Sequence, residues 1–435
     1  MTADRMVAGG KDPVVIVDGV RTPFARQFGE LAGWNGIELG SVATAELVAR
    51  SGVDPGMIDR IVYGQVILIP EAPNVAREVA LASGLRPATD AVAVSRACTT
   101  SLWAVTDIAR ALLCNEIEVG IGGGADSASV LPIQVSRVLA DALTRASRSK
   151  GLLQRLAAFS HVRPRHLIPR APAIRDYSTG LRMGDIAEQM ARDYGIGRGE
   201  QDALAAESHR KAADAWAAGL LDVEVALCSP PPHFHTIHKD SPVRPDTNLE
   251  TLGKLRPAFD RRYGTVTAGN SPPLTDGACS LLLMRASRAR TLGIAPLGAI
   301  RSWAMTGNDP FHDGLLGPSF AVPLALERAG LKLEDVDIVE FHEAFAAQVL
   351  ANLRVWRSAK FAKDVLGRSR PLGEVDPQRF NVNGGSIAFG HPFAATGGRL
   401  VVQALNELRR RQESTALVTA CAAGGLGVAM VLERI

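Results

Sequence analysis

The sequence predicts an α/β protein made of two related halves with a different segment inserted between them. Over residues 13–127, short β-branched runs alternate with amphipathic, alanine-rich stretches in the order β-α-β-α-β-α-β. This order is typical of a largely parallel sheet covered by helices on both faces. A similar order of segments returns over residues 297–435, and the likeness of IDRIVYG to VDIVEFH adds to it.

The expected elements follow one another closely in both halves. In the first half they are, in order, PVVIVDGVRTPF, GSVATAELVARSG, IDRIVYGQV, NVAREVALASGL, DAVAVSRAC, TSLWAVTDIARALLCN and IEVGIGGGADS. The second half repeats the order with LGAIRSWAM, FAVPLALERAG, VDIVEFHEAF, FNVNGGSIAFG, HPFAATGGRLVVQALNELRRR, TALVTACAAGG and VAMVLERI. Proline clusters break the helical pieces in between. We therefore expect a first half of 1–127 with 258–297, an inserted loop domain of 128–257, and a second half of 298–435.

Length and composition indicate a folded, water-soluble protein. The 435 residues are 46% hydrophobic and 21% charged, which suits large α/β cores and argues against disorder. No run approaches the roughly 18 apolar residues of a membrane-spanning helix, and the first residues lack the apolar core of a signal peptide. We therefore expect a cytoplasmic protein. The net charge of +3 and the lack of a recognised motif give no sign of nucleic-acid binding.

The cysteines and histidines give no sign of a disulfide framework or a resident metal. The five cysteines are scattered and contain no CxxC pair. His233, His235 and His238 have metal-like spacing, but they lie in a proline-rich loop without an obvious fourth ligand. We expect no bound metal, and we expect any special cysteine to be catalytic.

A basic stretch stands out within the inserted segment. Residues 131–175 contain nine Lys or Arg and one Asp among leucines and alanines. One interpretation is a solvated helical face. The other is contact with an anionic partner, either a membrane surface or a phosphate-bearing ligand.

Cys98 is the first candidate nucleophile. It follows the expected strand AVAVS and precedes the expected helix TTSLWAV, so its sulfur should lie near a helix N-terminus. Unpaired N–H groups and the positive end of the helix dipole there favour the thiolate. The alternative is a small buried cysteine at the end of a strand.

Three further reactive residues lie beside glycines or at strand-to-helix junctions in the second half. They are His342 in FHEAF, His391 in GGSIAFGHPFAATG and Cys421 in TACAAGGLG. Glycines let backbone and substrate approach closely. One such histidine is more often structural than catalytic, but all four residues in one alternating fold favour a Cys/His/Cys/His site.

At this point the sequence resembles the thiolase family from about residue 12 to Ile435. The matching motifs occur in the family's order: VDGVRTPF, SRACTTSLWAV, VTAGNSPPLTDGA, HEAF, GGSIAFGHPFAATG and CAAGGLG. The form with HEAF in place of NEAF looks like the β-subunit class of fatty-acid oxidation trifunctional complexes. The resemblance implies duplicated βαβαβαββ halves in a layered α-β-α-β-α core.

The resemblance also implies a role for each reactive residue. Cys98 would carry the acyl group as a thioester, and His391 would take its proton and help to hold a thioester oxygen. Cys421 would handle the α-proton and deprotonate incoming CoA. His342 replaces the usual asparagine and would donate to the enolate oxygen. A second oxyanion hole would use the backbone N–H groups of Cys98 and Ala423.

Three positions depart from the family pattern. Ala394 replaces the last glycine of GHPxG, Pro272 stands where many relatives have a serine near the pantetheine arm, and Arg182 replaces a frequent histidine. Met183 and Phe259 remain candidate substrate-lining residues, with an ordinary core role as the alternative.

The expected function is that of a 3-ketoacyl-CoA thiolase, which splits 3-oxoacyl-CoA into acetyl-CoA and a shortened acyl-CoA in fatty-acid β-oxidation. CoA would be a substrate, with no bound cofactor. Expected partners are a second copy in a homodimer or larger assembly, a hydratase/dehydrogenase α-subunit and a peripheral membrane contact. Alternatives are a biosynthetic acetoacetyl-CoA thiolase, a non-catalytic acyl-CoA or lipid carrier of the same fold, and a 3-oxoacyl synthase, which usually lacks a cysteine like Cys421.

Overall fold

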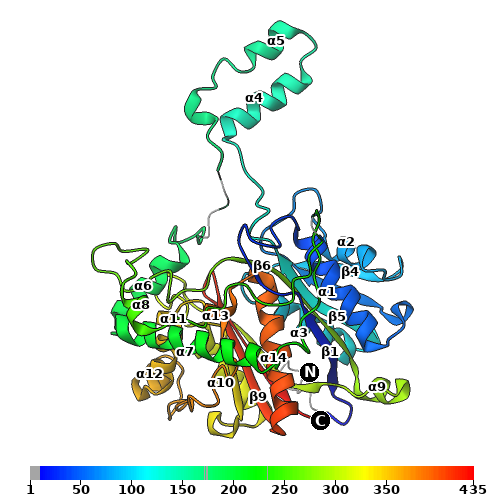
Figure 1. The fold of residues 1–435 in the computed structure, drawn as a ribbon, viewed down its shortest axis with the longest axis vertical. Coiled ribbons are helices and arrows are strands. Elements are labelled where there is room, and N and C mark those ends of the chain that lie inside the picture. Colours follow the sequence, from blue (N-terminus) through cyan, green and yellow to red (C-terminus); the bar gives the residue numbers. More distant parts are fainter. Residues whose placement is uncertain (1–9, 171, 173–174, 233) are drawn as a thin grey trace.

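The strands of both halves join in one mixed sheet (Figure 1). The computed structural model describes residues 10–170, 172, 175–232 and 234–435. The main path of the sheet runs β4-β3-β5-β6-β1-β7-β10-β9-β8, and the short β2 pairs with β6. The strands are β1 Val14–Arg21, β2 Ala25–Arg26, β3 Arg60–Gly64, β4 Asp90–Val94, β5 Val119–Asp126, β6 Thr275–Arg285, β7 Gly298–Gly307, β8 Ile338–Phe341, β9 Thr415–Ala422 and β10 Leu426–Glu433.

The strand order is mirrored about the junction between β1 and β7. In the first half β3 runs parallel to β4 and β5, while β6 is antiparallel to β5 and β1. In the second half β8 runs parallel to β9, while β10 is antiparallel to β9 and β7. The counterpart of β4 is reduced to one parallel bridge between Val339 and Phe380, within the expected segment FNVNGGSIAFG. The predicted pair of related α/β halves is confirmed.

The two halves meet at a very short pairing. Only Val15 with Ala299 and Ile16 with Gly298 are paired between β1 and β7. A Cβ atom on Gly298 would lie 2.5 Å from Leu405 Cδ2 and 2.9 Å from the carbonyl oxygen of Glu433. A glycine therefore fits at this position, because α14 and β10 of the second half leave no room for a side chain.

Helices α3 (Thr100–Leu113) and α14 (Thr396–Arg411) form the middle layer between the two halves of the sheet. Each contacts strands of its own half, and they contact each other. Ser101 Oγ of α3 accepts a 2.8 Å hydrogen bond from the N–H of Gly398. A Cβ on Gly397 would lie 2.6 Å from Leu102 Cγ, so small residues allow this close crossing.

The outer layers are α1 (Gly36–Ser51) and α2 (Val75–Ala82) on the first half, and α10 (Gly317–Ala329) and α11 (Ala346–Trp356) on the second. Successive strand residues alternate between layers, as the two-residue period of a strand requires. Leu281 and Leu283 of β6 face the middle helices, whereas Leu282 and Met284 face α1 and α2. The expected α-β-α-β-α layering is confirmed.

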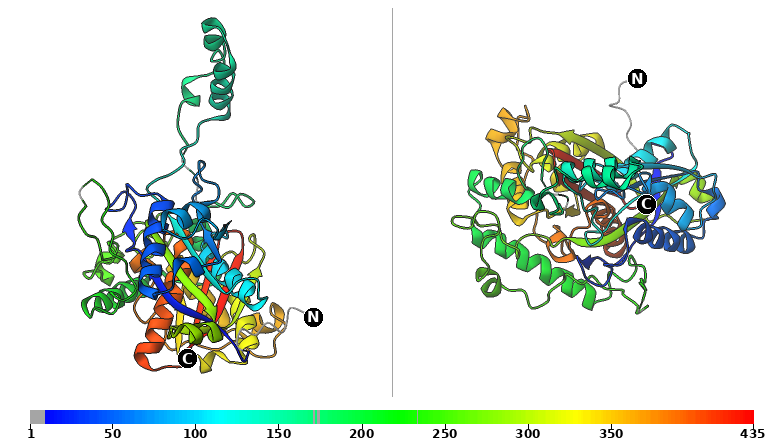
Figure 2. Two further views of the ribbon diagram at one scale, coloured as in Figure 1. Left: turned by 90° about the vertical axis from the view of Figure 1, so that its right-hand side faces the viewer. Right: turned by 90° about the horizontal axis from the view of Figure 1, so that it is seen from above.

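The inserted segment contributes two different parts (Figures 1 and 2). Helices α4 (Arg137–Arg148) and α5 (Leu152–Ala157) form an arm that stands away from the body. Helices α6 (Met183–Asp193), α7 (Arg198–Ala217) and α8 (Leu249–Gly253) belong to the body, where α6 and α7 pack against α11 of the second half. The domain boundaries at 127, 257 and 297 stay a prediction, although β6 lies in the first-half sheet between β5 and β1.

The remaining short helices connect these layers. They are α9 Ala286–Leu292, α12 Ala359–Asp364 and α13 Ser386–Phe389, with 3-10 turns at Pro55–Met57, Pro164–His166, Leu333–Asp335 and Phe393–Ala395. Within the described part of the chain, every helix is too short or too polar to cross a bilayer. The cytoplasmic location stays a prediction.

Candidate active site

Cys98 lies where the sequence predicts it, in the turn between β4 and the start of α3. Ala97, just before it, has a left-handed backbone with φ of +48°, and the N–H of Thr100 donates to the Ala97 carbonyl. The guanidinium of Arg96 donates to the carbonyl oxygens of Thr306 and Gly427 at 3.1 and 3.3 Å. The turn that carries the thiol is thus anchored to two strands of the second half.

Cys98 and His391 form a direct pair. Cys98 Sγ lies 3.1 Å from His391 Nε2, and His391 Nδ1 lies 2.6 Å from Thr396 Oγ1. His391 follows Gly390, whose φ is +91°. The backbone N–H of His391 donates to the carbonyl of Pro273. The ring is therefore fixed on both sides, with one nitrogen turned to the thiol.

Burial controls the protonation state of this pair. It raises the pKa of the Cys98 thiol to about 12, against the opposing effect of the N–H groups of Ala423 and Cys98. Burial and Arg399 lower the pKa of His391 to about 3. The N–H groups act in the direction expected for a helix start, but burial has the larger effect on the Cys98 pKa. Desolvation outweighs the helix terminus, so Cys98 is a thiol facing a neutral imidazole that can accept its proton.

Cys421 lies at the end of β9 and faces the same space as Cys98. It is fully buried, and burial and the neighbouring Cys98 hold its pKa well above the ordinary value. The following turn uses Gly424 and Gly425 with φ of +78° and +68°. The Asp176 carboxylate accepts a 2.9 Å hydrogen bond from the N–H of Gly424, which fixes the turn.

His342 lies directly after β8 and behind His391. The two imidazole rings are 4.3 Å apart between centroids. Its backbone N–H donates to the carbonyl of Thr419 on β9, and Nδ1 lies 2.8 Å from Ser386 Oγ. Burial, His391 and Arg399 hold the pKa of His342 well below its ordinary value, so this ring is neutral.

A cavity of about 450 Å³ brings most of the predicted residues together. Its lining is mainly apolar and includes groups from both halves and from the inserted segment. From the predicted set, these are Cys98, Met183, His391, Cys421 and Ala423. His342 contacts the cavity residue His391 from behind, as described above.

Phe259 and the three departures from the family pattern have different positions. Phe259 packs edge-on against Phe345, at 6.1 Å, and is not among the residues lining the cavity. Pro272 does line it. Arg182 pairs with Asp185 and stacks over the Phe259 ring at 5.0 Å. A Cβ on Gly124 would lie 3.0 Å from the methyl group of Ala394, so this extra methyl faces β5.

Asp126 is a site residue that the sequence reasoning missed. Its carboxylate accepts hydrogen bonds from the N–H groups of Val66, Ile67 and Ala394. Burial raises its pKa to about 7, against these three donors. It thereby ties cavity-lining residues of the first half to the His391 turn of the second. The glycine run that precedes Asp126 in the sequence could have indicated this position. One of these glycines, Gly124, permits the close approach of Ala394.

The cluster also has the chemistry of a metal site. Cys98 Sγ and one nitrogen each of His342 and His391 lie within 4.8 Å of one another. A thiolate and two imidazoles suit a soft transition-metal ion such as zinc. The absence of a resident metal stays a prediction, and His233 of the histidine triplet lies outside the described residues.

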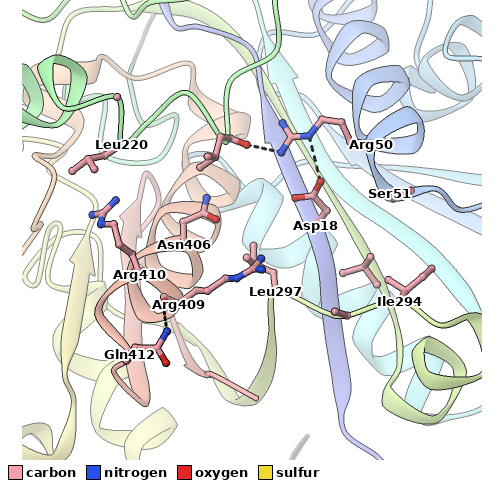
Figure 3. Close-up of a pocket in the computed structure, with 14 residues that line it drawn as sticks. Asp18, Arg50, Ser51, Leu220, Ile294, Leu297, Asn406, Arg409, Arg410 and Gln412 are labelled. Carbon is pink, nitrogen blue, oxygen red and sulfur yellow. Dashed lines mark hydrogen bonds and ion pairs between the residues drawn. The ribbon is translucent and has the colours of Figure 1, made fainter.

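A larger cavity, of about 840 Å³, lies elsewhere (Figure 3). It is lined by Asp18, Arg50, Arg409 and Arg410 among others. Arg50 pairs with Asp18 at 3.5 Å. None of its lining residues is a cysteine or histidine, so the nucleophilic chemistry belongs to the smaller cavity.

Comparisons with known proteins agree with this architecture. The family models for the N-terminal and C-terminal thiolase domains match residues 14–287 and 294–434. The chain is 57% identical over 420 residues to a 3-ketoacyl-CoA thiolase of Erwinia tasmaniensis, covering 97% of this chain and 96% of that protein. It is 54% identical over 422 residues to a 3-ketoacyl-CoA thiolase of Yersinia pestis, covering 97% of each.

Solved structures show the same fold. A Bacillus anthracis acetyl-CoA acetyltransferase matches with a TM-score of 0.83 and 30% identity over 97% of this chain and 98% of that one. Human mitochondrial 3-ketoacyl-CoA thiolase in complex with CoA matches with a TM-score of 0.81 and 29% identity, with the same coverage.

Fold and relatives together define an acyltransferase. More particularly, the chain belongs to the thiolase family, because both family domains match in order and cover nearly the whole sequence. The resemblance drawn from the motifs is confirmed.

Proposed function

We propose that this protein is a degradative 3-ketoacyl-CoA thiolase of fatty-acid β-oxidation, which cleaves 3-oxoacyl-CoA with CoA into acetyl-CoA and a shortened acyl-CoA. The observation that carries the proposal is the contact between Cys98 Sγ and His391 Nε2, which lies in one apolar cavity with Cys421. The relatives at 54% and 57% identity carry the name of this activity.

The same groups would also serve a biosynthetic acetoacetyl-CoA thiolase. A chain-length series of 3-oxoacyl-CoA substrates separates this alternative from the proposal. Preference for acetoacetyl-CoA alone would favour the biosynthetic enzyme.

The first half-reaction breaks the carbon–carbon bond. Cys98 Sγ attacks the C3 carbonyl carbon of the substrate while its proton passes to His391 Nε2. The C2–C3 bond then breaks, its electron pair forms the enolate of acetyl-CoA, and the acyl group stays on Cys98 as a thioester. The Cys421 thiol protonates the enolate at C2, and acetyl-CoA leaves.

The second half-reaction returns the enzyme to its starting state. The Cys421 thiolate takes the proton of incoming CoA, whose sulfur attacks the thioester carbonyl. The new carbon–sulfur bond forms as the bond to Cys98 breaks, and His391 returns its proton to Cys98. Backbone N–H groups of Cys98 and Ala423, which lower the pKa of the Cys98 thiol, would hold the oxyanion.

His342 is assigned to the enolate oxygen of the first half-reaction. The substitution His342→Ala should lower kcat for thiolysis about a hundredfold or more, because one oxyanion donor is lost. Initial rates at saturating substrate measure this effect. The exposed His312→Ala serves as a matched control and should retain wild-type rates. A change in KM alone would remove His342 from this role.

The expected homodimer finds support at the free edge of the sheet. Strand β4 is the last strand on its side, and Val92 in its middle is 38% exposed. Open edge strands pair readily with another strand, and a second copy would cover this one. Light scattering should then give twice the chain mass of 46.1 kDa. The α-subunit partner stays a prediction.

We further propose that the arm docks on an anionic membrane surface. Leu152, Leu153 and Leu156 of α5 are 73%, 83% and 63% exposed at the far end of the arm. Basic residues are close to these leucines in the sequence of the arm, namely Arg145, Arg148, Lys150 and Arg155. Exposed apolar groups bordered by cations are typical of an interfacial membrane contact.

Replacing those four basic residues with Gln should release the protein from anionic vesicles. Each cation near such a surface contributes about 1 kcal/mol, so the affinity should fall at least about a hundredfold. Flotation with phosphatidylserine vesicles measures it, and high salt should have the same effect on the wild type. A control that replaces Lys254, Lys332, Lys360 and Lys363 removes equal charge from the body and should still float. Equal flotation of both variants would show that the arm is a solvated face.

A further inference from the structure

A network of buried polar side chains begins at His342 Nδ1. Ser386 Oγ of α13 lies 2.8 Å from His342 Nδ1, and it accepts a 3.1 Å hydrogen bond from a guanidinium N–H of Arg399. All three side chains are fully buried. These hydrogen bonds therefore connect His342, beside the cavity, to the guanidinium of Arg399 in the middle layer of the fold.

Several contacts fix the guanidinium of Arg399 in this network. A second N–H of its guanidinium donates to Gln403 Oε1, one turn further along α14. Its planar group lies over the Phe389 ring at 5.3 Å. Burial lowers the pKa of Arg399, and the nearby carboxyl groups of Glu340 and Glu343 act in the opposite direction. The direction in which Arg399 presents its N–H to Ser386 is thus set by packing.

The direction of each hydrogen bond follows from the chemistry of the groups. A guanidinium only donates, so Ser386 Oγ must accept from Arg399. Within the described part of the chain, the only other recorded partner of Ser386 Oγ is His342 Nδ1. The buried serine hydroxyl makes a hydrogen bond with its own hydrogen only if that hydrogen points to Nδ1, and we therefore take Nδ1 as the acceptor. A neutral imidazole that accepts at Nδ1 carries its proton on Nε2.

The second ring nitrogen of His342, Nε2, is free to donate a hydrogen bond to a ligand. Nε2 is fully buried, and no residue in the described ranges is its hydrogen-bond partner. An unpaired buried N–H is energetically unfavourable, and a ligand oxygen that accepts from it would remove this penalty. The ring lies against His391 and within reach of Cys98, where the substrate must react.

We propose that Ser386 and Arg399 are positioning residues that hold His342 in the tautomer with its proton on Nε2, so that this N–H meets the enolate oxygen when the C2–C3 bond breaks. The inference rests on the proposed function for its substrate. Neither residue touches the reacting atoms; both act through His342.

The kinetic test separates the two half-reactions. Ser386→Ala should lower kcat for thiolysis about tenfold to a hundredfold and leave KM within about threefold, because an oxyanion donor is misdirected. Exchange of labelled CoA into butyryl-CoA should stay within about twofold of the wild type. That exchange forms no enolate and uses the N–H groups of Cys98 and Ala423. Ser386→Thr keeps the hydroxyl and should restore thiolysis.

A matched control and a direct observation complete the test. Ser302→Ala removes another fully buried hydroxyl, which bonds the Ala325 carbonyl far from the site, and both rates should stay unchanged. Equal loss of both reactions in Ser386→Ala would show a merely structural role, and no loss would also overturn the proposal.

Nitrogen-15 spectra of labelled histidine, assigned with His342→Asn, should show the proton on Nε2. A proton on Nδ1 would overturn the proposal even if the enzyme fails to cleave 3-oxoacyl-CoA.

Discussion

Cys98→Ala should leave less than about one ten-thousandth of the wild-type thiolysis rate, because removal of a covalent nucleophile abolishes the acyl-enzyme path. The structure offers no replacement for it. Cys421 lies in the same cavity, but the hydrogen bond from thiol to imidazole joins Cys98 to His391. The loss of 3-oxoacyl-CoA on mixing with CoA measures the effect.

Two observations complete that experiment. The exposed Cys114→Ala is the matched control, since its thiol is remote from the cavity, and it should retain full activity. Wild-type enzyme incubated with acyl-CoA and digested should carry the acyl mass on the peptide that contains Cys98. An acyl mass found only on the Cys421 peptide would reverse the two assignments.

Cys421→Ser should slow both cleavage and condensation by at least about a hundredfold, because a general acid–base is replaced by a far weaker acid. The substitution is nearly isosteric, so the turn at Gly424 and Gly425 should keep its shape. Acylation of Cys98 should remain detectable by mass, since His391 still accepts the thiol proton. Slow turnover with retained acylation of Cys98 would indicate a defect in proton transfer at C2. Loss of the nucleophile would abolish the acylation as well.

Both directions must be measured for this variant. Rates of 3-oxoacyl-CoA cleavage and of its formation from acyl-CoA and acetyl-CoA should fall together, because the same proton is given in one direction and taken in the other. The buried Cys228→Ser, outside the cavity, controls for a new buried hydroxyl. Near-normal turnover in both directions would exclude Cys421 from the mechanism.

The sequence predicted the layers of the fold well because they depend on local periodicity. Alternating segments specify strands and helices, and the repeated order specified two halves. Distant pairings were harder to predict. Cys98 and His391 are 293 positions apart, and only the family motifs predicted that they meet. The arm shows the same limit, since its charge indicated a helical surface but not its separation from the body.

Buried polar residues were the least predictable part of the site. Arg399 stands in TGGRLVV at the start of α14, and Ser386 follows two glycines at the start of α13. Their contact depends on how α13 packs against α14, which no local pattern specifies. The net shift of the Cys98 pKa could not be predicted for a related reason. A helix start is visible in the sequence, whereas the depth of burial that outweighs it is a property of the whole fold.

The shared middle layer also determines when this chain can finish folding as it is made. The first half buries one side of α3 against its own sheet, but the other side packs on α14 and the second half. Helix α14 comes after the inserted segment and most of the second half, so it leaves the ribosome much later than α3. Until then the nascent first half must keep an apolar helix face uncovered, a state that favours aggregation. Duplicated halves that share one core therefore complete their folding together, once α14 has been made.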